Sequence, residues 1–526
     1  MGCTRKPAGP VHPRSGAGAV PTTMLACIAT VLWFVAPLCG AKDLIDETWI
    51  ELRSPHLVVV SALSEARTAV LAQSLEKFRI AVALIPDVGR LPPTRPTRIY
   101  LLPFTSATLD FSNRHRAFAS LSLRGNDIAI LDSQGDNDEL LKHFYAHGLI
   151  QGTNDVGSPR WLDEGIAQLL SSVHVRGTAI DIGDVLVRNG KILGWGGWMP
   201  FTSLLEAHGP AHFTYWHRDQ FYAQSWLLMH YLMLGRKDID FPAQVRRYLT
   251  ISRAGTARVP AFEQAFGLRV EDLRQILRVY MRDLGSGALS IAQPLADAAV
   301  IVRPLPQDEI AAQLGRLKTV YGRYDEAQPL FGASLALNPR NTTALIGTGD
   351  QLTRAGKFAD AERYYQQAVV IEPHNALYEL DYAGIYLHRA TAGRGTARAH
   401  PDLEEARRHL QRSLELAPDT AEGFQQMGLT YLEPGEATAQ ALPPLLRAHA
   451  LLPWEPDICY ALAQAYAANH QLDAARQELR ALMTWADLNK DPEIYDAELV
   501  ALDRRSTPAA RETNAPGALP PPPATR

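Results

Sequence analysis

The sequence predicts an α+β domain followed by an all-α solenoid of repeated helix pairs. Short β-branched runs alternate with helical patterns up to about residue 287. From residue 306 onwards, prolines and small residues recur at a spacing of about 34 residues, which is typical of stacked helix pairs. The chain has 526 residues, too many for one hydrophobic core, so at least two domains are expected.

The N-terminal segment, residues 1–41, is expected to be a signal peptide. Basic residues precede an apolar run at 24–38, which is short for a membrane span but suits a signal-peptide core. Small residues at 39–41 provide a cleavage site after Ala41. An uncleaved membrane anchor formed by residues 24–38 is the alternative. The protein is therefore expected to be exported, either periplasmic or secreted, and to touch a membrane only if this segment is retained.

Charge and cysteine content narrow the possible partners and cofactors. The net charge of −4 provides no general basic surface, so no nucleic-acid partner is expected. Three of the four cysteines (Cys3, Cys27 and Cys39) lie in the leader, and only Cys459 lies beyond it. The cleaved chain can therefore form no internal disulfide, and it has no thiolate cluster for a structural zinc site.

Residues 42–287 are expected to form the α+β domain. The run PHLVVVSA is a β-branched strand, and the following segment 64–85 has helical spacing. TRIYLLP reads as a buried strand, and FASLSLRGNDIAILD as a hairpin about Gly125-Asn126. The next segment, DNDELLKHFYAHGLIQ, has acidic residues at its start, as a helix N-terminus prefers.

This last helix carries two histidines, His143 and His147, four residues apart. That spacing places both imidazoles on one helix face, where they can reach one zinc ion at about 2.0–2.1 Å. After a short connection, GSPRWLDEGIAQLLSS predicts a second helix that carries Glu164. A carboxylate from this helix would complete a His₂Glu site with an open fourth position. Gly165 beside it would allow a close helix contact.

Four segments of this domain resemble the gluzincin-type zinc peptidases, and in particular the peptidase-MA-like domains found before repeats. They are HFYAHGLI, PRWLDEGIAQLL, FYAQSWLLMHYL at 221–232 and the helical stretch 261–284. The resemblance spans most of residues 42–287 and implies a gluzincin-like α+β fold. By position it makes His143 and His147 the helix ligands of a zinc ion and Glu164 the third ligand.

The sequence departs from the peptidase pattern at Phe144, where H-E-x-x-H enzymes carry the glutamate that takes a proton from the metal-bound water. A phenyl ring cannot accept a proton. Gln168 is a second departure, because relatives often carry a supporting acid there. Tyr222 is a weak candidate for an oxyanion-stabilising group, with packing against Trp226 and Tyr231 as the alternative. No catalytic residue is therefore assigned.

Residues 288–305 are expected to link the first domain to a repeat region at 306–486. Four prolines, at steps of 34, 45 and 35 residues, close similar sequences, SLALNP, AVVIEP, SLELAP and HALLP. A small residue keeps these steps at Ala327, Ala361, Ala406, Ala441 and Ala475, and the longer third unit carries extra residues, TAGRGTARAHP, between its two helices. YGRYDEAQPLFGASLALNP and AGKFADAERYYQQAVVIEP resemble the tetratricopeptide repeat, with about five units. Such a stack has a concave groove that implies a protein or peptide partner. The tail, 487–526, is expected to be disordered from about residue 506.

Three functions are compatible with these patterns. The first is a scaffold that binds a protein through its repeats and keeps a metallopeptidase-like domain with lost or lowered activity. The second is an active zinc metallopeptidase that uses an atypical base, such as Asp163. The third is a pure repeat adaptor in envelope assembly, in which the histidine pair has no metal.

Overall fold

The computed structural model describes most of the chain. The described residues are 44–85, 96–112, 117–122, 125–132, 137–151, 159–194, 197–207, 215–282, 284, 289–393, 396, 399–453, 455–485 and 497–501. The predicted leader and the predicted disordered tail lie outside these ranges. Within them, no helix combines the length and the apolar character needed to cross a membrane.

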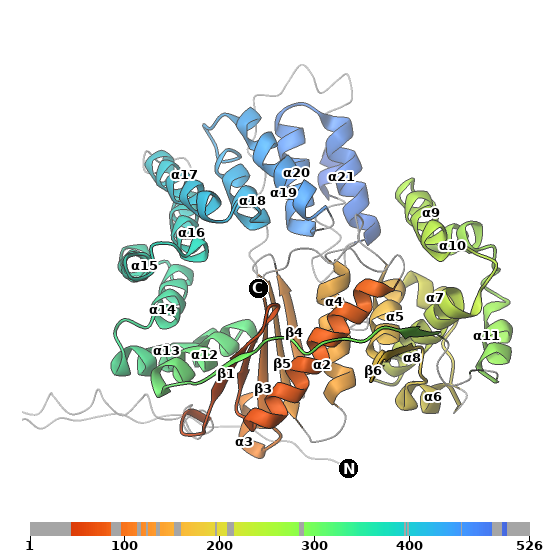
Figure 1. Ribbon diagram of the computed structural model, residues 1–526. Coiled ribbons are helices and arrows are strands. Elements are labelled where there is room, and N and C mark those ends of the chain that lie inside the picture. Colours follow the sequence, from red (N-terminus) through yellow and green to blue (C-terminus); the bar gives the residue numbers. More distant parts are fainter. Residues whose placement is uncertain are drawn as a thin grey trace, which may run out of the picture.

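A six-stranded mixed sheet forms the base of the first domain, with strand order β4-β5-β3-β2-β1-β9 (Figure 1). Its strands are β1 (Ile50–Arg53), β2 (Leu57–Ser61), β3 (Thr97–Pro103), β4 (Ala117–Ser122), β5 (Gly125–Asp132) and β9 (Ile301–Pro304). The β2–β3 and β3–β5 pairs are parallel, and the other pairs are antiparallel. The predicted hairpin is present, but Gly125 and Asn126 pair with Ser122 and Leu121, so they lie in strand β5 rather than at the turn.

The two faces of this sheet contact different helices because side chains alternate along each strand. On β3, Ile99 and Leu101 face a core that includes α2 (Glu65–Leu84) and α4 (Asn137–Gln151). Tyr100 and Leu102 face a second core, to which α12 (Gln307–Val320) contributes. The first helix of the repeat region therefore packs against the sheet as part of the first domain.

The rest of the first domain is mostly helical. Its elements are α3 (Ser106–Phe111), α5 (Arg160–Ser171), β6 (His174–Arg176), β7 (Ala179–Ile182), α6 (Val187–Gly194), α7 (Phe201–Glu206), α8 (Tyr215–His230), the π-helix η2 (Tyr231–Gly235), α9 (Phe241–Arg253), α10 (Arg258–Phe266), α11 (Leu273–Arg282) and β8 (Leu289–Ala292). Strands β6, β7 and β8 form a small antiparallel sheet.

The segment 288–305, expected to be a linker, is instead part of the first domain. It supplies β8 to the small sheet and β9 to the edge of the large sheet. Between these strands, the side-chain amide of Gln73 on α2 both donates to the carbonyl of Ala298 and accepts from its N–H, each over 2.8 Å. The prediction was wrong here because the apolar runs are short and lie among prolines. They show no clear periodicity, and their strand structure depends on pairing with distant strands.

The repeat region is confirmed as a stack of helix pairs, five of them within the described residues. They are α12 with α13 (Tyr324–Leu337), α14 (Thr342–Arg354) with α15 (Phe358–Ile371), α16 (Ala376–Ala392) with α17 (Ala399–Leu416), α18 (Ala421–Thr430) with η3 (Thr438–Ala441) and α19 (Leu442–Leu451), and α20 (Pro456–Ala468) with α21 (Leu472–Trp485). The extra residues of the third unit lengthen its helices to 17 and 18 residues.

The small residues of the repeat lie where helices touch. Ala327, Ala361, Ala406, Ala441 and Ala475 are each 0 % exposed. A Cβ atom added to Gly315 would lie 2.7 Å from the ring of Phe331, and one added to Gly349 would lie 2.9 Å from the ring of Tyr365. Larger side chains at these positions would push the paired helices apart, which explains why small residues recur at this step.

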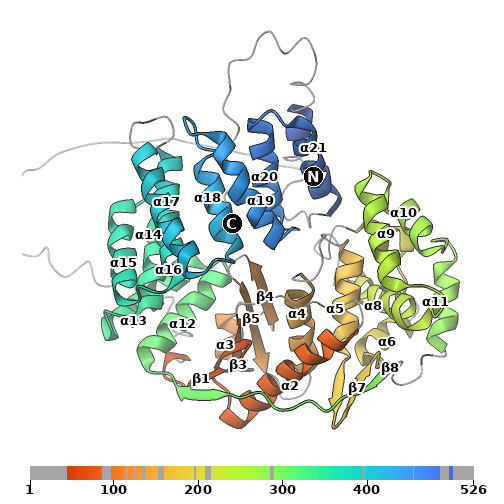
Figure 2. The ribbon, with the colours of Figure 1, turned by 45° about the horizontal axis from the view of Figure 1, so that its top comes forward.

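The repeats arch away from the sheet and return to the first domain. Figures 1 and 2 show the helix pairs running from α12, against the sheet, round to α21. There α21 lies beside α9 of the first domain. The two ends of the solenoid therefore both contact the same domain.

The β1–β9 edge contains a buried carboxylate that makes folding sensitive to acid. Burial would raise the pKa of Glu51, but hydrogen bonds from Arg53 and Arg303 and their charges outweigh it and hold the pKa below 4.5. A depressed folded-state pKa contributes stability above 4.5 and loses it as the pH falls through the lower value. We expect Glu51→Gln to lower the urea midpoint at neutral pH, with the difference from the unmodified chain shrinking below pH 4.5. A difference independent of pH would contradict this assignment.

Candidate metal centre

Helix α4 presents its two histidines on the side opposite its deepest packing. Leu141, Tyr145 and Leu149 are almost fully buried in the main core, and they fix the rotation of the helix. His143 and His147, one turn apart, then face α5 from the edge of that core. Both are buried, at 9 % and 8 % exposed.

Helix α5 brings the carboxylate of Glu164 up to this face. Trp161, Leu162 and Leu169 are buried on the core side, and Glu164 is itself 3 % exposed. Gly165 allows α5 to pack closely against α8, because a Cβ atom at this position would lie 2.7 Å from the backbone oxygen of Ser225 on α8. The close helix approach expected at Gly165 is thus present, with α8 as the neighbouring helix.

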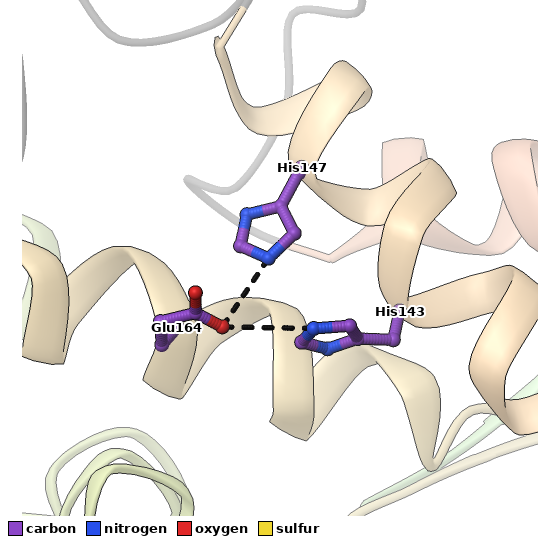
Figure 3. Close-up of side chains that lie close together, drawn as sticks. All are labelled: His143, His147 and Glu164. Atoms are coloured by element: carbon purple, nitrogen blue, oxygen red, sulfur yellow. Dashed lines mark ion pairs between the residues drawn. The ribbon is translucent and has the colours of Figure 1, made fainter. Parts of the chain in front are cut away.

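Three ligand atoms converge between α4 and α5 (Figure 3). The Nε2 atom of His147 lies 3.3 Å from Oε2 of Glu164, and Nε2 of His143 lies 3.6 Å from the same oxygen. All three ligand atoms lie within 4.8 Å of one another. Tetrahedral zinc with bonds of about 2.0–2.1 Å separates its ligand atoms by roughly 3.3 Å. The distances from Oε2 of Glu164 to the two histidine Nε2 atoms are close to that separation.

The hydrogen-bond pattern of Glu164 leaves one oxygen for a further ligand. Arg160, one turn earlier on α5, donates to Oε1 over 3.2 Å. Oε2 is buried and has no hydrogen-bond donor among the described residues, although it faces both imidazoles. A buried carboxylate oxygen without a donor is costly, and a cation between it and the two nitrogens would satisfy it. The residues present therefore fit a zinc ion.

Asp163 supports the site from behind His147. Its Oδ2 lies 3.3 Å from Nδ1 of His147, the ring nitrogen that points away from Glu164, and Arg160 donates to the same oxygen over 3.3 Å. A carboxylate on Nδ1 favours the tautomer whose Nε2 carries a free lone pair toward the site. The side-chain oxygen of Gln168, one turn after Glu164, accepts a hydrogen bond from Asn189 on α6 over 3.2 Å.

The pKa values of the two histidines are shifted in opposite directions. Burial, with the charge of His147, lowers the pKa of His143 to about 4. Burial would also lower the pKa of His147, but the charges of Asp163 and Glu164 outweigh it and raise that pKa. The pKa of Glu164 is lowered because His147, with smaller contributions from His143 and Arg160, overcomes the effect of burial. His143 is therefore neutral at pH 7, whereas His147 is protonated without a metal and would have to release its Nε2 proton when a metal binds.

The two aromatic residues of interest both lie beside His143. The ring of Phe144 is partly buried and meets the His143 ring edge-on, with centroids 5.4 Å apart. Tyr222 on α8 is perpendicular to His143 at 6.3 Å, and burial raises the pKa of its hydroxyl. The expected packing partners of Tyr222 pair elsewhere: Trp226 with His230, and Tyr231 with Tyr280. Tyr222 thus borders the site.

Other histidines of the first domain serve different purposes. His230 is a satisfied core residue: its ring nitrogens lie 2.8 Å from the Tyr280 hydroxyl and 3.0 Å from the carbonyl oxygen of Gly183. His208 and His212, also four residues apart in sequence, lie outside the described residues. Sequence reasoning considered Asp163 only as a base and missed the contact of Arg160 with Glu164. The spacing of four residues between Arg160 and Glu164 on one helix is the signal that could have revealed that contact.

Comparisons with known proteins concern the repeat fold. No family model matches the chain, and no curated protein matches it. A tetratricopeptide protein of Thermus thermophilus shares 25% identity over 37% of this chain and 99% of its own, with a TM-score of 0.34. PilW, described as a type IV pilus biogenesis factor, shares 18% identity over 39% of this chain and 89% of its own, with a TM-score of 0.33. YrrB, a tetratricopeptide protein with an unusual peptide-binding site, shares 18% identity over 36% and 90%, with a TM-score of 0.28.

The helix pairs, whose small residues recur at steps of 34, 45, 35 and 34 residues, identify residues 306–486 as a repeat region of the tetratricopeptide type.

The close contact at Gly165 leads to a direct test of the site's framework. Gly165→Ala places a methyl group against the backbone of α8, and we expect it to destabilise the protein by about 1–3 kcal/mol. Gly332→Ala on α13 is the matched control, because nothing lies within 4 Å of its Cβ position; there alanine should stabilise the helix by about 0.5–1 kcal/mol. Urea unfolding of both variants measures the difference. Equal effects would show that α5 and α8 are not in close contact.

Proposed function

We propose that this protein is an exported repeat scaffold whose first domain retains a peptidase-like zinc site with lost or lowered hydrolytic activity. The observation that carries the proposal is the convergence of His143, His147 and Glu164 on one point, with Phe144 at the position of the general base. When bound, zinc supplies a Lewis acid that polarises a ligated water or carbonyl oxygen.

The residues of the chain explain why binding would persist while proton transfer fails. His143 and His147 each direct Nε2 toward Glu164, and Arg160 and Asp163 hold the ligands in place. Phe144 offers no acceptor for a proton. Asp163, the candidate atypical base, already contacts Nδ1 of His147 and Arg160. Its engagement on the far side of the ring supports a positioning role over a role as base.

The repeats supply the binding function in this proposal. Five helix pairs form a continuous stack within the described residues, and stacks of this kind present an extended surface to a peptide or a partner helix. The expected leader at 1–41 places the partner outside the cytoplasm. Because both ends of the stack contact the first domain, a bound partner would also lie near that domain.

Metal content tests the zinc site. We expect His143→Ala combined with His147→Ala to lose one equivalent of zinc per chain relative to the unmodified protein, measured by elemental mass spectrometry after dialysis. His374→Ala, an exposed histidine between α15 and α16, is the matched control and should lose none. The same zinc content in the double variant and the unmodified chain would refute the metal centre. The urea midpoint of the double variant shows whether the fold is retained.

A further inference from the structure

A second group of metal-binding side chains lies at the far end of the repeat stack. His449 on α19, Cys459 on α20 and Glu478 on α21 each place one ligand atom within 4.8 Å of the other two. The Nε2 atom of His449 lies 3.8 Å from Oε2 of Glu478. This cluster belongs to none of the elements of the first site.

The fold of the last repeats creates this arrangement. Cys459 is buried at 5 % exposure in a small core with Ala463 and Ala475, where α20 and α21 pack closely. Its thiol donates to the carbonyl of Pro453 over 3.4 Å. The side chains of His449 and Glu478 are 29 % and 18 % exposed, so an ion can reach the cluster from solvent.

We propose that His449, Cys459 and Glu478 form a second binding site for zinc or a similar divalent cation. An imidazole nitrogen, a thiolate sulfur and a carboxylate oxygen are the three ligand types that zinc takes in proteins. Calcium and magnesium prefer oxygen ligands alone, so the thiolate selects against them. On binding, the sulfur–metal bond replaces the S–H bond, and the thiol proton passes to water.

The site would join three consecutive helices and stiffen the end of the repeat stack that contacts the first domain. Its ligands come from the last two helix pairs, and α21 also lies beside α9 of the first domain (Figure 1). A metal bridge here would hold α21 against α19 and α20 and so hold the end of the stack in its contact with α9. The chemistry differs from that of the first site, which has no thiolate.

Cobalt(II) distinguishes the two sites in the full-length protein. A cobalt–thiolate bond produces a charge-transfer absorption in the near ultraviolet, whereas two imidazoles and a carboxylate produce none. We expect titration of the metal-free chain with cobalt(II) to develop this band to a limit of one cobalt per chain, and zinc to remove it. The combined His143→Ala and His147→Ala variant should keep the band in full, so that loss of the first site does not affect the result.

Cys459→Ser and His449→Gln are the variants that test the cluster. Both should lose the band while retaining the unmodified urea midpoint in the metal-free state, because neither removes a large buried side chain. Absence of the band in the unmodified chain would overturn the proposal. Persistence of the band in Cys459→Ser would overturn it as well, since another cysteine would then be the ligand. A full band in His449→Gln would exclude the three-ligand site.

Discussion

Phe144→Glu is expected to create chelator-sensitive hydrolysis of an unstructured protein such as casein. The substitution places a carboxylate directly after His143, on the helix face that already carries both imidazoles. General-base catalysis typically contributes about 10²–10⁴ in rate, which corresponds to about 3–5 kcal/mol of barrier. We therefore expect activity at least about 100-fold above that of the unmodified chain.

Phe144→Gln is the matched control for this gain. Glutamine removes the ring and has the size and polarity of glutamate, but it cannot take a proton. If the missing base is the main defect, only the glutamate variant should hydrolyse casein. Equal activity in both variants would show that the ring had blocked the site. Zinc retained without any activity in Phe144→Glu would show that the cleft has lost more than its base.

Truncation before the first repeat is expected to unfold the first domain. Ile310, Leu314 and Leu317 of α12 and Leu330 of α13 are buried against the second face of the main sheet, and Arg316 pairs with Asp127 of β5 over 3.0 Å. Burying a large aliphatic side chain contributes about 1.5–3 kcal/mol. Four such residues together approach the whole stability of a domain, about 5–15 kcal/mol. A chain of residues 42–305 should therefore aggregate.

A chain of residues 42–341 is the control for this truncation. It keeps α12 and α13 and ends between helix pairs, where repeat proteins tolerate loss of their neighbours. We expect it to be a soluble monomer by size-exclusion chromatography and to unfold cooperatively in urea. If residues 42–305 fold equally well, the repeats are an independent unit and α12 does not belong to the first domain's packing.

The repeat region could be predicted from sequence because its packing rule is local. Each helix pair has an alanine at the same position, and steps of 34 or 35 residues outside the longer third unit reveal it without any knowledge of distant contacts. The attachment of α12 to the sheet could not be predicted in this way. Ile310, Leu314 and Leu317 have the helical spacing of any buried face, and nothing in that spacing says that the neighbour is a β-sheet.

The convergence of His143, His147 and Glu164 could be predicted from the sequence, but the contacts of the residues around them could not. A spacing of four places His143 and His147 on one helix face, and the resemblance supplied Glu164. The contact between Asp163 and Nδ1 of His147 depends on how α4 and α5 cross, which local patterns do not encode. The second cluster is harder still, because His449, Cys459 and Glu478 come from three helices with no recurring spacing.

Hydrolysis by the unmodified chain tests the central claim most directly. The zinc-loaded protein is incubated with casein, with and without a chelator, beside the combined His143→Ala and His147→Ala variant. If the unmodified chain holds zinc but lacks a base, it should cleave no more casein than the double variant, both with and without the chelator. Cleavage by the unmodified chain that stops when the chelator removes its zinc would contradict this account.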